Sequence, residues 1–525
     1  MHTALGLAVM LAGLILSATA LAQGTVGAAA GSDTRGRFLA VISDNHLGLG
    51  RNPGGAWSPT EDFRWPKALK GFLASLSQRG NHAVDLVVAG DLFELWQPPE
   101  HIECAGASAD LGCTVEEMVM ISDIVARAHA PELALLAEFA ERGENRVHLI
   151  PGNHDAALLL EPVWQKFAAP LRAANERVLL VRSGTWTSAD GYVVVEHGHQ
   201  IGADVNKYVG WPDRNQLVRS EGGKTYVIRP WGERFVQLVF NDQEAQYQII
   251  DNLSPESAGV RYRMADRGLW RSLSDLARFI AFNVFETSAA QKTGLLGPPS
   301  ADEPEEKRWD IPTARAAGHQ LIAKALPPDD PFRTELLAED ERAVALQNEF
   351  DRLVADDKEL SDGELRGLCD LAAATSEGAW ALCRPAVLGA LAEATVVPLR
   401  WKLREHLMQR IDEFKRMRVF IYGHTHAMQA PWRLEVDSLS AVVVANSGAF
   451  QRLIDDEGFM GRVNAKKWSA AEGLRRLKPE DLPPCYGVIL VPYEDARPAP
   501  NAQMWWMPED GKEGEFVAPR DQRCR

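Results

Sequence analysis

Five short polar clusters, each placed directly after an apolar run, constrain the fold of this chain more than any other feature of its sequence. The apolar runs read "RFLAVIS", "AVDLVVA", "RVHLIP", "GYVVVE" and "RVFIY". In an open α/β sheet, ligands bind at the carboxyl ends of the strands, so polar clusters at strand ends can converge on one crevice. The clusters are Asp44-Asn45-His46, Gly90-Asp91, Gly152-Asn153-His154-Asp155, His197-Gly198-His199 and Gly423-His424-Thr425-His426.

The segments between the first three runs have apolar residues at helical spacing. They read "WPKALKGFLASLSQRG" and "APELALLAEFAERG", and both end at a glycine, which is a common stop signal for a helix. Strand, helix, strand, helix, strand is the pattern of a mostly parallel sheet. The stretches "RVLLVRSG" and "GYVVVEHG" flank a turn at "SADG" and are expected to form a hairpin.

The alternation of strands and helices stops in the middle of the chain. That stretch contains a Pro- and acid-rich passage and amphipathic helical segments, whereas strand patterns resume at "RVFIYGHTH" and "CYGVILVPY". We therefore expect one split domain with a mostly helical insertion that caps the crevice. Tryptophans 211, 231, 270 and 309 of this insertion could contact substrate or form its core. The expected division is 1–22 signal peptide, 37–203 first part of the core, 204–394 insertion, 395–500 second part of the core and 501–525 C-terminal tail.

The first residues form an apolar leader that ends in Ala20-Leu21-Ala22. This small-x-small ending predicts a signal peptide cleaved after Ala22, with an uncleaved membrane anchor as the alternative. No later stretch is long and apolar enough to predict a transmembrane segment in the mature chain. The leader thus predicts a periplasmic or secreted protein.

Six cysteines fall into three neighbourhoods, which suggests disulfides in an oxidising compartment. Pairing of near neighbours is the simplest hypothesis. A zinc site is a weaker alternative because the chain has no CxxC, and buried free thiols are another. The neighbourhoods are Cys104 with Cys113, Cys369 with Cys383, and Cys485 with Cys524.

The formal net charge of −16 argues against non-specific nucleic-acid binding, which needs a basic surface. It does not exclude a phosphorylated substrate, because bound metal ions can supply positive charge locally.

The residue types in the five clusters point to metal ions. Asp, Asn and His are hard-to-borderline ligands that suit transition metals, and seven ligands are too many for one tetrahedral ion but fit two ions that share a carboxylate. Taken singly, each cluster has a plain alternative, such as a turn, a solvated histidine or a buried hydrogen bond. The ordered set of five predicts a shared metal site.

The series D-x-H, G-D, G-N-H-D, H-G-H and G-H-x-H resembles the motifs of the calcineurin-like metallophosphoesterase superfamily. The resemblance spans Asp44 to His426 and continues into "NSGAF". It implies a four-layer α/β/β/α sandwich, here split by the insertion, with two divalent or transition metal ions such as Mn, Fe or Zn.

The resemblance also implies a role for each matching residue. His154 would face the phosphate and Asp155 would orient it, while His199 could contact substrate, support a ligand or only bond a nearby loop. Asn153 would lie at the substrate as well as at a metal. The implied metal ligands are Asp44, His46 and His426 for one ion, Asn153, His197 and His424 for the other, and Asp91 as the bridge.

The implied activity is a secreted metal-dependent phosphoesterase that uses a metal-bridging hydroxide on a phosphorylated small molecule or lipid. The stretch "GDLFELW" is similar to the second motif of UDP-2,3-diacylglucosamine pyrophosphatase, so a pyrophosphatase acting on a nucleotide- or lipid-linked substrate is an alternative. A non-catalytic metal-stabilised binding protein is a second alternative. In this stretch Phe93 and Trp96 are expected to pack beneath Asp91, and Glu94 could orient a ligand histidine.

Overall fold

The structure is a computed structural model that describes two large segments of the chain. The predicted signal peptide, most of the predicted insertion, Trp270, Trp309 and the cysteines at 369 and 383 lie outside them. The described residues are 37–254 and 402–525, except residues 53, 105, 107, 109, 174–175, 202–205, 238–240, 437–440, 495 and 510–511.

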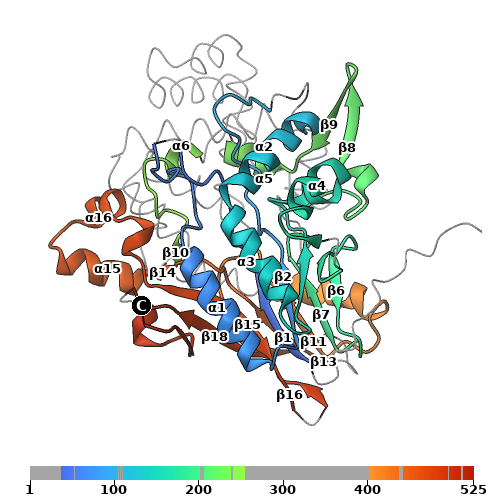
Figure 1. Cartoon of the computed structure of the whole chain (residues 1–525), viewed down its shortest axis with the longest axis vertical. Helices are drawn as coiled ribbons and strands as arrows, with labels where there is room; N and C mark the ends of the chain where they lie inside the picture. The colour runs from blue at the N-terminus through green and yellow to red at the C-terminus, as the bar shows by residue number, and fades with distance from the viewer. Residues whose placement is uncertain are drawn as a thin grey trace, which may run out of the picture.

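The larger sheet has seven strands in the order β19-β18-β15-β1-β2-β4-β5. Figure 1 labels its strands β18, β15, β1 and β2. Its parallel half is β1 (Phe38–Ile42), β2 (Val84–Ala89), β4 (Arg146–Ile150) and β5 (Val178–Leu180). Its antiparallel half is β15 (Cys485–Val491), β18 (Asn501–Trp506) and β19 (Glu515–Val517).

The second sheet has five strands in the order β12-β13-β11-β7-β6, with β13, β11 and β7 parallel. It packs face to face on the first sheet, because Val41 and Val87 of one share a buried cluster with Val195 and Ile421 of the other. Its strands are β12 (Gln429–Glu435), β13 (Ala441–Asn446), β11 (Val419–Tyr422), β7 (Val193–Glu196) and β6 (Thr185–Thr187).

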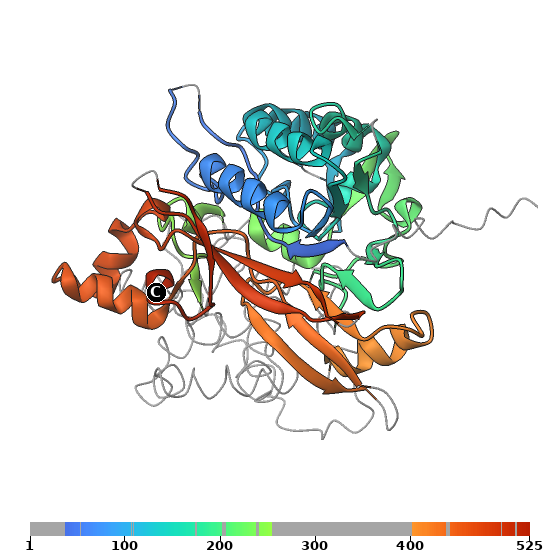
Figure 2. The ribbon, with the colours of Figure 1, turned by 60° about the horizontal axis from the view of Figure 1, so that its bottom comes forward.

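Helices cover both outer faces of the sheet pair (Figure 2). Ala40 and Ile42 point away from the second sheet into a core formed with the helices of the first half. On the other side, Leu403 and Leu407 of a helix over residues 402–411 pack on the second sheet. The expected four-layer α/β/β/α architecture is therefore confirmed. The helices on the first sheet are α1 (Pro66–Arg79), α2 (Val115–Ala128), α3 (Ala130–Glu141) and α4 (Glu161–Ala168).

The described start of the predicted insertion connects the two halves of the chain. Its strand β9 (Lys224–Ile228) pairs with β3 (Leu111–Thr114) on one side and with β8 (Val218–Glu221) on the other, and β10 (Leu253–Ser254) pairs with β14 (Ile454–Asp455). Tyr247 and Ile250 share a core with the C-terminal helices. These C-terminal helices are α15 (Asp456–Ala465) and α16 (Ala470–Arg476). The inserted segment itself contains the short helices α5 (Trp231–Phe235) and α6 (Asn241–Glu244).

Two expected boundaries shift in the structure. The hairpin forms between β6 and β7 around "SADG", whereas "RVLLV" supplies β5 at the edge of the larger sheet. Residues 501–517 do not form a separate tail, since β18 and β19 extend that sheet past residue 500. The remaining short elements are η1 (Ala156–Leu159), η3 (Arg214–Gln216), η7 (Pro479–Asp481), η8 (Gln522–Cys524), β16 (Tyr493–Glu494) and β17 (Arg497–Pro498).

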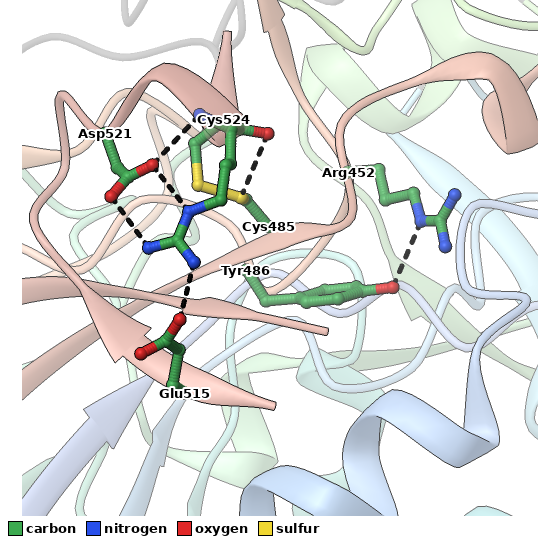
Figure 3. The surroundings of a disulfide bond; sticks show 7 residues. Arg452, Cys485, Tyr486, Glu515, Asp521 and Cys524 are labelled. Carbon is green, nitrogen blue, oxygen red and sulfur yellow. Dashed lines mark hydrogen bonds and ion pairs between the residues drawn. A yellow bond between two sulfur atoms is a disulfide. The ribbon is translucent and has the colours of Figure 1, made fainter. Parts of the chain in front are cut away.

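Two of the three expected disulfides lie in the described residues, and both are formed. Cys104 bonds Cys113, and Cys485 bonds Cys524, which ties the C-terminal turn η8 to β15 (Figure 3). Such bonds persist in oxidising compartments, as the leader also predicts. In the described part of the chain, no helix has the length and apolar character needed to cross a membrane.

Candidate metal centre

The five polar clusters meet where the parallel strands of the two facing sheets end. The first three follow β1, β2 and β4 of the larger sheet, and the last two follow β7 and β11 of the smaller one. Several of these residues adopt a left-handed backbone, which costs a residue other than glycine of order 1–3 kcal/mol and is concentrated at functional sites. Those with positive φ are Asp44, His46, Asp91, His424 and His426.

Asp44, His46 and His426 form a first group whose ligand atoms lie within 4.8 Å of one another. Oδ1 of Asp44 lies 3.6 Å from Nε2 of His426. Among the described residues, this Oδ1 and Nε2 of His46 are buried without a hydrogen-bond partner. Because buried polar atoms are almost always satisfied, this donor set fits a metal ion.

Asp91, His197 and His424 form a second group of the same compactness. Nε2 of His197 lies 2.9 Å from Oδ2 of Asp91 and 2.8 Å from Oδ1 of Asn153. Nδ1 of His197 donates to the carbonyl oxygen of Ala89 at 2.8 Å, so Nε2 is the ring nitrogen that faces Asp91 and Asn153. Asn153 thus joins this group, as the sequence motif predicts.

The carboxylate of Asp91 lies between the two groups. Oδ2 is 2.9 Å from Nε2 of His197 in the second group and 4.0 Å from Nε2 of His46 in the first. Oδ1 accepts the backbone N–H of His154 at 2.8 Å, which fixes the carboxylate in place. The carboxylate of Asp91 therefore lies beside a histidine of each group.

The side-chain partner of His154 is Glu94 rather than Asp155. Asp155 accepts the backbone N–H groups of Gly152 at 2.6 Å, Leu92 at 2.9 Å and Phe93 at 3.2 Å, so its carboxylate is turned toward the loops. Asp155 therefore does not make the expected contact with the side chain of His154 but fixes the turn that carries it.

Glu94 connects His154 to the first metal group. Its Oε2 lies 2.6 Å from Nδ1 of His154 and 3.0 Å from Nδ1 of His46. The ring of His154 also stacks on Trp96, with centroids 3.9 Å apart and planes inclined by 25°. Phe93 is buried and stacks on Phe167, as expected for a packing residue, whereas Trp96 lines the site beside His154, which the sequence analysis did not predict.

The buried carboxylates of the site favour positive charge on the neighbouring histidines of both groups. Burial opposes the charge on His46, but its hydrogen bond to Glu94 and the charge of Asp91 raise its pKa to about 10. Burial likewise opposes charge on His197, and Asp91 raises its pKa to about 9. Burial acts against the Glu94 carboxylate, but His154 and His46 lower its pKa to about 2. Two metal ions can take the place of these protons.

His199 lies beside the second group, against two side chains of the inserted segment. Its ring centroid is 5.3 Å from that of His197, 4.5 Å from that of Trp211 and 6.1 Å from that of Tyr208. The Tyr208 hydroxyl donates to the carbonyl oxygen of Asn153 at 3.1 Å. Sequence reasoning did not identify Tyr208, since nothing local marks a lone tyrosine near the start of an insertion.

The structure thus gathers Asp, Asn and His side chains at the facing strand ends of a four-layer sandwich, as the motif resemblance implies. Comparison with known families agrees: the model of the calcineurin-like phosphoesterase family matches residues 39–276. The match includes the first four clusters, and the structure adds His424 and His426 from outside it. Neither the curated proteins nor the solved structures contain a match to the chain. The UDP-2,3-diacylglucosamine pyrophosphatase subfamily receives no support from these comparisons.

Proposed function

We propose that this chain is an exported phosphoesterase that hydrolyses a phosphate ester with two bound metal ions. The observation that supports this most is the position of Asp91, whose carboxylate lies between two compact His/Asp groups. The family match supports phosphoester chemistry, and the two disulfides support export. The signal peptide and its cleavage after Ala22 belong to this proposal.

The metal ligands are assigned by proximity. Asp44, His46 and His426 would hold the first ion, and Asn153, His197 and His424 would hold the second, with Asp91 available to both. When bound, such ions would supply positive charge that neutralises phosphoryl oxygens and activates water.

His154 acts on the substrate rather than on a metal. Its side chain is 18% exposed, whereas that of Asp91 is 2% exposed, so it faces the open side of the group. Nδ1 of His154 donates a hydrogen bond to Glu94, so in the imidazolium form Nε2 carries the second proton and can donate it to a phosphoryl or leaving-group oxygen. General acid catalysis of this kind contributes about 10²–10⁴-fold to a rate.

Hydrolysis of p-nitrophenyl phosphate and of its bis ester tests the proposal. The full-length chain is stripped with chelator and assayed with and without Mn²⁺, Zn²⁺ or Fe²⁺. The proposal expects metal-dependent turnover that Asp91→Asn abolishes and the exposed-site control Glu116→Gln retains. Binding of metal without turnover of any phosphoester would instead support the non-catalytic alternative.

A pyrophosphatase acting on a nucleotide- or lipid-linked substrate is the second candidate function. The stretch from Gly90 to Trp96 favours it, and the structure brings Trp96 to the site. A panel of nucleoside diphosphate esters, sugar phosphates and phospholipids, assayed for phosphate release with and without added phosphatase, separates the two reactions. Release of a nucleoside monophosphate would favour the pyrophosphatase.

A further inference from the structure

His199 is a buried side chain whose two ring nitrogens make no hydrogen bond to the described residues. It is 2% exposed, and within the described residues neither Nδ1 nor Nε2 has a hydrogen-bond partner. Packing rather than hydrogen bonding fixes its ring, because Trp211 and Tyr208 meet it edge to face at 85° and 86°. A buried imidazole in this state calls for a hydrogen-bond partner, which the described residues do not supply.

His199 and His154 lie beside different metal groups. The ring of His154 is 4.6 Å from that of His46 in the first group. The ring of His199 is 5.3 Å from that of His197 and 6.4 Å from that of His424 in the second. If His154 serves the leaving oxygen, His199 lies near a substituent that stays on phosphorus, since the retained substituents surround the axis of an in-line attack.

Resting on the proposed function, we infer that His199, Tyr208 and Trp211 form a subsite for a retained organic group. The substrate class is then a phosphodiester or a pyrophosphate ester, in which phosphorus keeps a second substituent after cleavage. A phosphomonoester has no such group to place there.

The chemistry of the subsite favours an organic group that can donate and accept hydrogen bonds and that is either flat or hydroxylated. A neutral imidazole offers one N–H donor and one acceptor nitrogen. Aromatic rings add apolar contact area beside these polar atoms, as in most small-molecule sites. The segment also reaches the surface, because Trp211 is partly exposed and the neighbouring Val209 is 81% exposed. A nucleoside or sugar moiety meets these requirements.

Three chromogenic substrates with one leaving group test the inference. They are p-nitrophenyl phosphate, methyl p-nitrophenyl phosphate and thymidine p-nitrophenyl phosphate, and they differ only in what stays on phosphorus. In the metal-loaded full-length protein, kcat/KM for the thymidine ester should exceed that for the methyl ester by about tenfold or more. His199→Phe, which keeps a ring but removes both nitrogens, should bring this ratio close to one, mainly through KM.

Three controls separate recognition from a structural effect. His199→Gln restores a donor and an acceptor and should recover part of the ratio, whereas Val209→Ser on the same segment should retain it. Calorimetry gives a readout without turnover: thymidine monophosphate should bind the wild type more tightly than inorganic phosphate, and His199→Phe should remove the difference.

The inference is overturned if the wild type prefers the methyl ester, or if His199→Phe lowers turnover of all three substrates equally. Loss of bound metal in His199→Phe would also overturn it, because His199 would then support the metal ligands. Failure of the proposed function gives a different result, in which no metal-loaded form releases p-nitrophenol from any of the three.

Discussion

Oε2 of Glu94 lies 2.6 Å from Nδ1 of His154 and 3.0 Å from Nδ1 of His46, so one carboxylate oxygen fixes both imidazoles. One carboxylate therefore positions a proposed metal ligand and a proposed proton donor together.

Replacement of this carboxylate by an amide should reduce turnover and metal affinity together. Glu94→Gln keeps the shape of the side chain but can no longer accept from both rings with a full negative charge. We expect kcat and the affinity for the first metal ion each to fall by about 10–100-fold, as is typical when a partner of a ligand histidine is lost. Steady-state kinetics and metal titration measure the two effects, and a fall in kcat alone would show that His46 does not depend on Glu94.

Loss of the His154 ring should affect chemistry without affecting metal content. In His154→Ala both metal groups keep their ligand atoms, because the contact of Asp91 with residue 154 is made by the backbone N–H. We expect kcat to fall by about 10²–10⁴-fold while elemental analysis still finds the wild-type metal content. A variant that loses metal would show that His154 is a ligand.

Removal of the shared carboxylate should disrupt both metal sites. Asp91 lies within reach of both groups and holds the backbone of His154, so Asp91→Ala takes away a ligand from each ion. We expect bound metal to fall from about two ions to one or fewer per chain, with no measurable turnover. Asp190→Ala, in the "SADG" turn, is the matched control. Two tightly bound ions in Asp91→Ala would contradict the assignment of a bridge.

The strands and their polar ends could be predicted because both signals are local. Val41 and Ile42 point to opposite faces of one buried strand, which therefore reads as a continuous apolar run. The clusters after such runs then converge because parallel strands end at the same edge. Sheet membership is not a local property. The apolar run that forms β5 looks, from its composition, like one strand of a hairpin. Its pairing with β4 in the larger sheet depends on tertiary contacts that the local sequence does not reveal.

The residues that line the site through contacts between distant parts of the chain could not be predicted from the sequence. Trp96 stacks on a histidine 58 positions away, and Tyr208 bonds the backbone of Asn153. The C-terminal strands did carry a readable signal, since Ala502 and Trp505 are buried in a short apolar stretch.

Metal binding should release protons at mildly alkaline pH. In the metal-free chain the pKa of His46 is about 10 and that of His197 about 9, so both rings carry an extra proton near neutrality. A metal ion needs the lone pairs that these protons occupy, so loading should release about two protons per chain at about pH 8, and affinity should rise with pH. Calorimetry in buffers of different ionisation enthalpy counts the protons. Release of none would contradict the assignment of both ligands.

Stability should decrease at alkaline pH because of a buried histidine outside the metal groups. Nε2 of His129 lies 3.3 Å from Glu61, whose carboxylate also accepts the backbone N–H of Gly50 at 2.6 Å and so holds the loop that follows His46. Burial opposes the charge on His129, but its close contacts with the carboxylates of Glu132 and Glu61 raise its pKa to about 9.

The folded-state pKa of His129 lies above the unfolded value of 6.5, so the folded chain binds the proton more tightly. The resulting stabilisation is complete below about pH 6.5 and is lost as the pH rises through about 9; for a shift of this size it amounts to ~3 kcal/mol at most. Unfolding of the metal-loaded protein by urea should therefore show a decline in stability over this range that His129→Gln lacks and the exposed-site variant His101→Gln retains. Equal slopes in all three proteins would mean that His129 is neutral in the folded chain, and that Glu61 holds the loop without a positive partner.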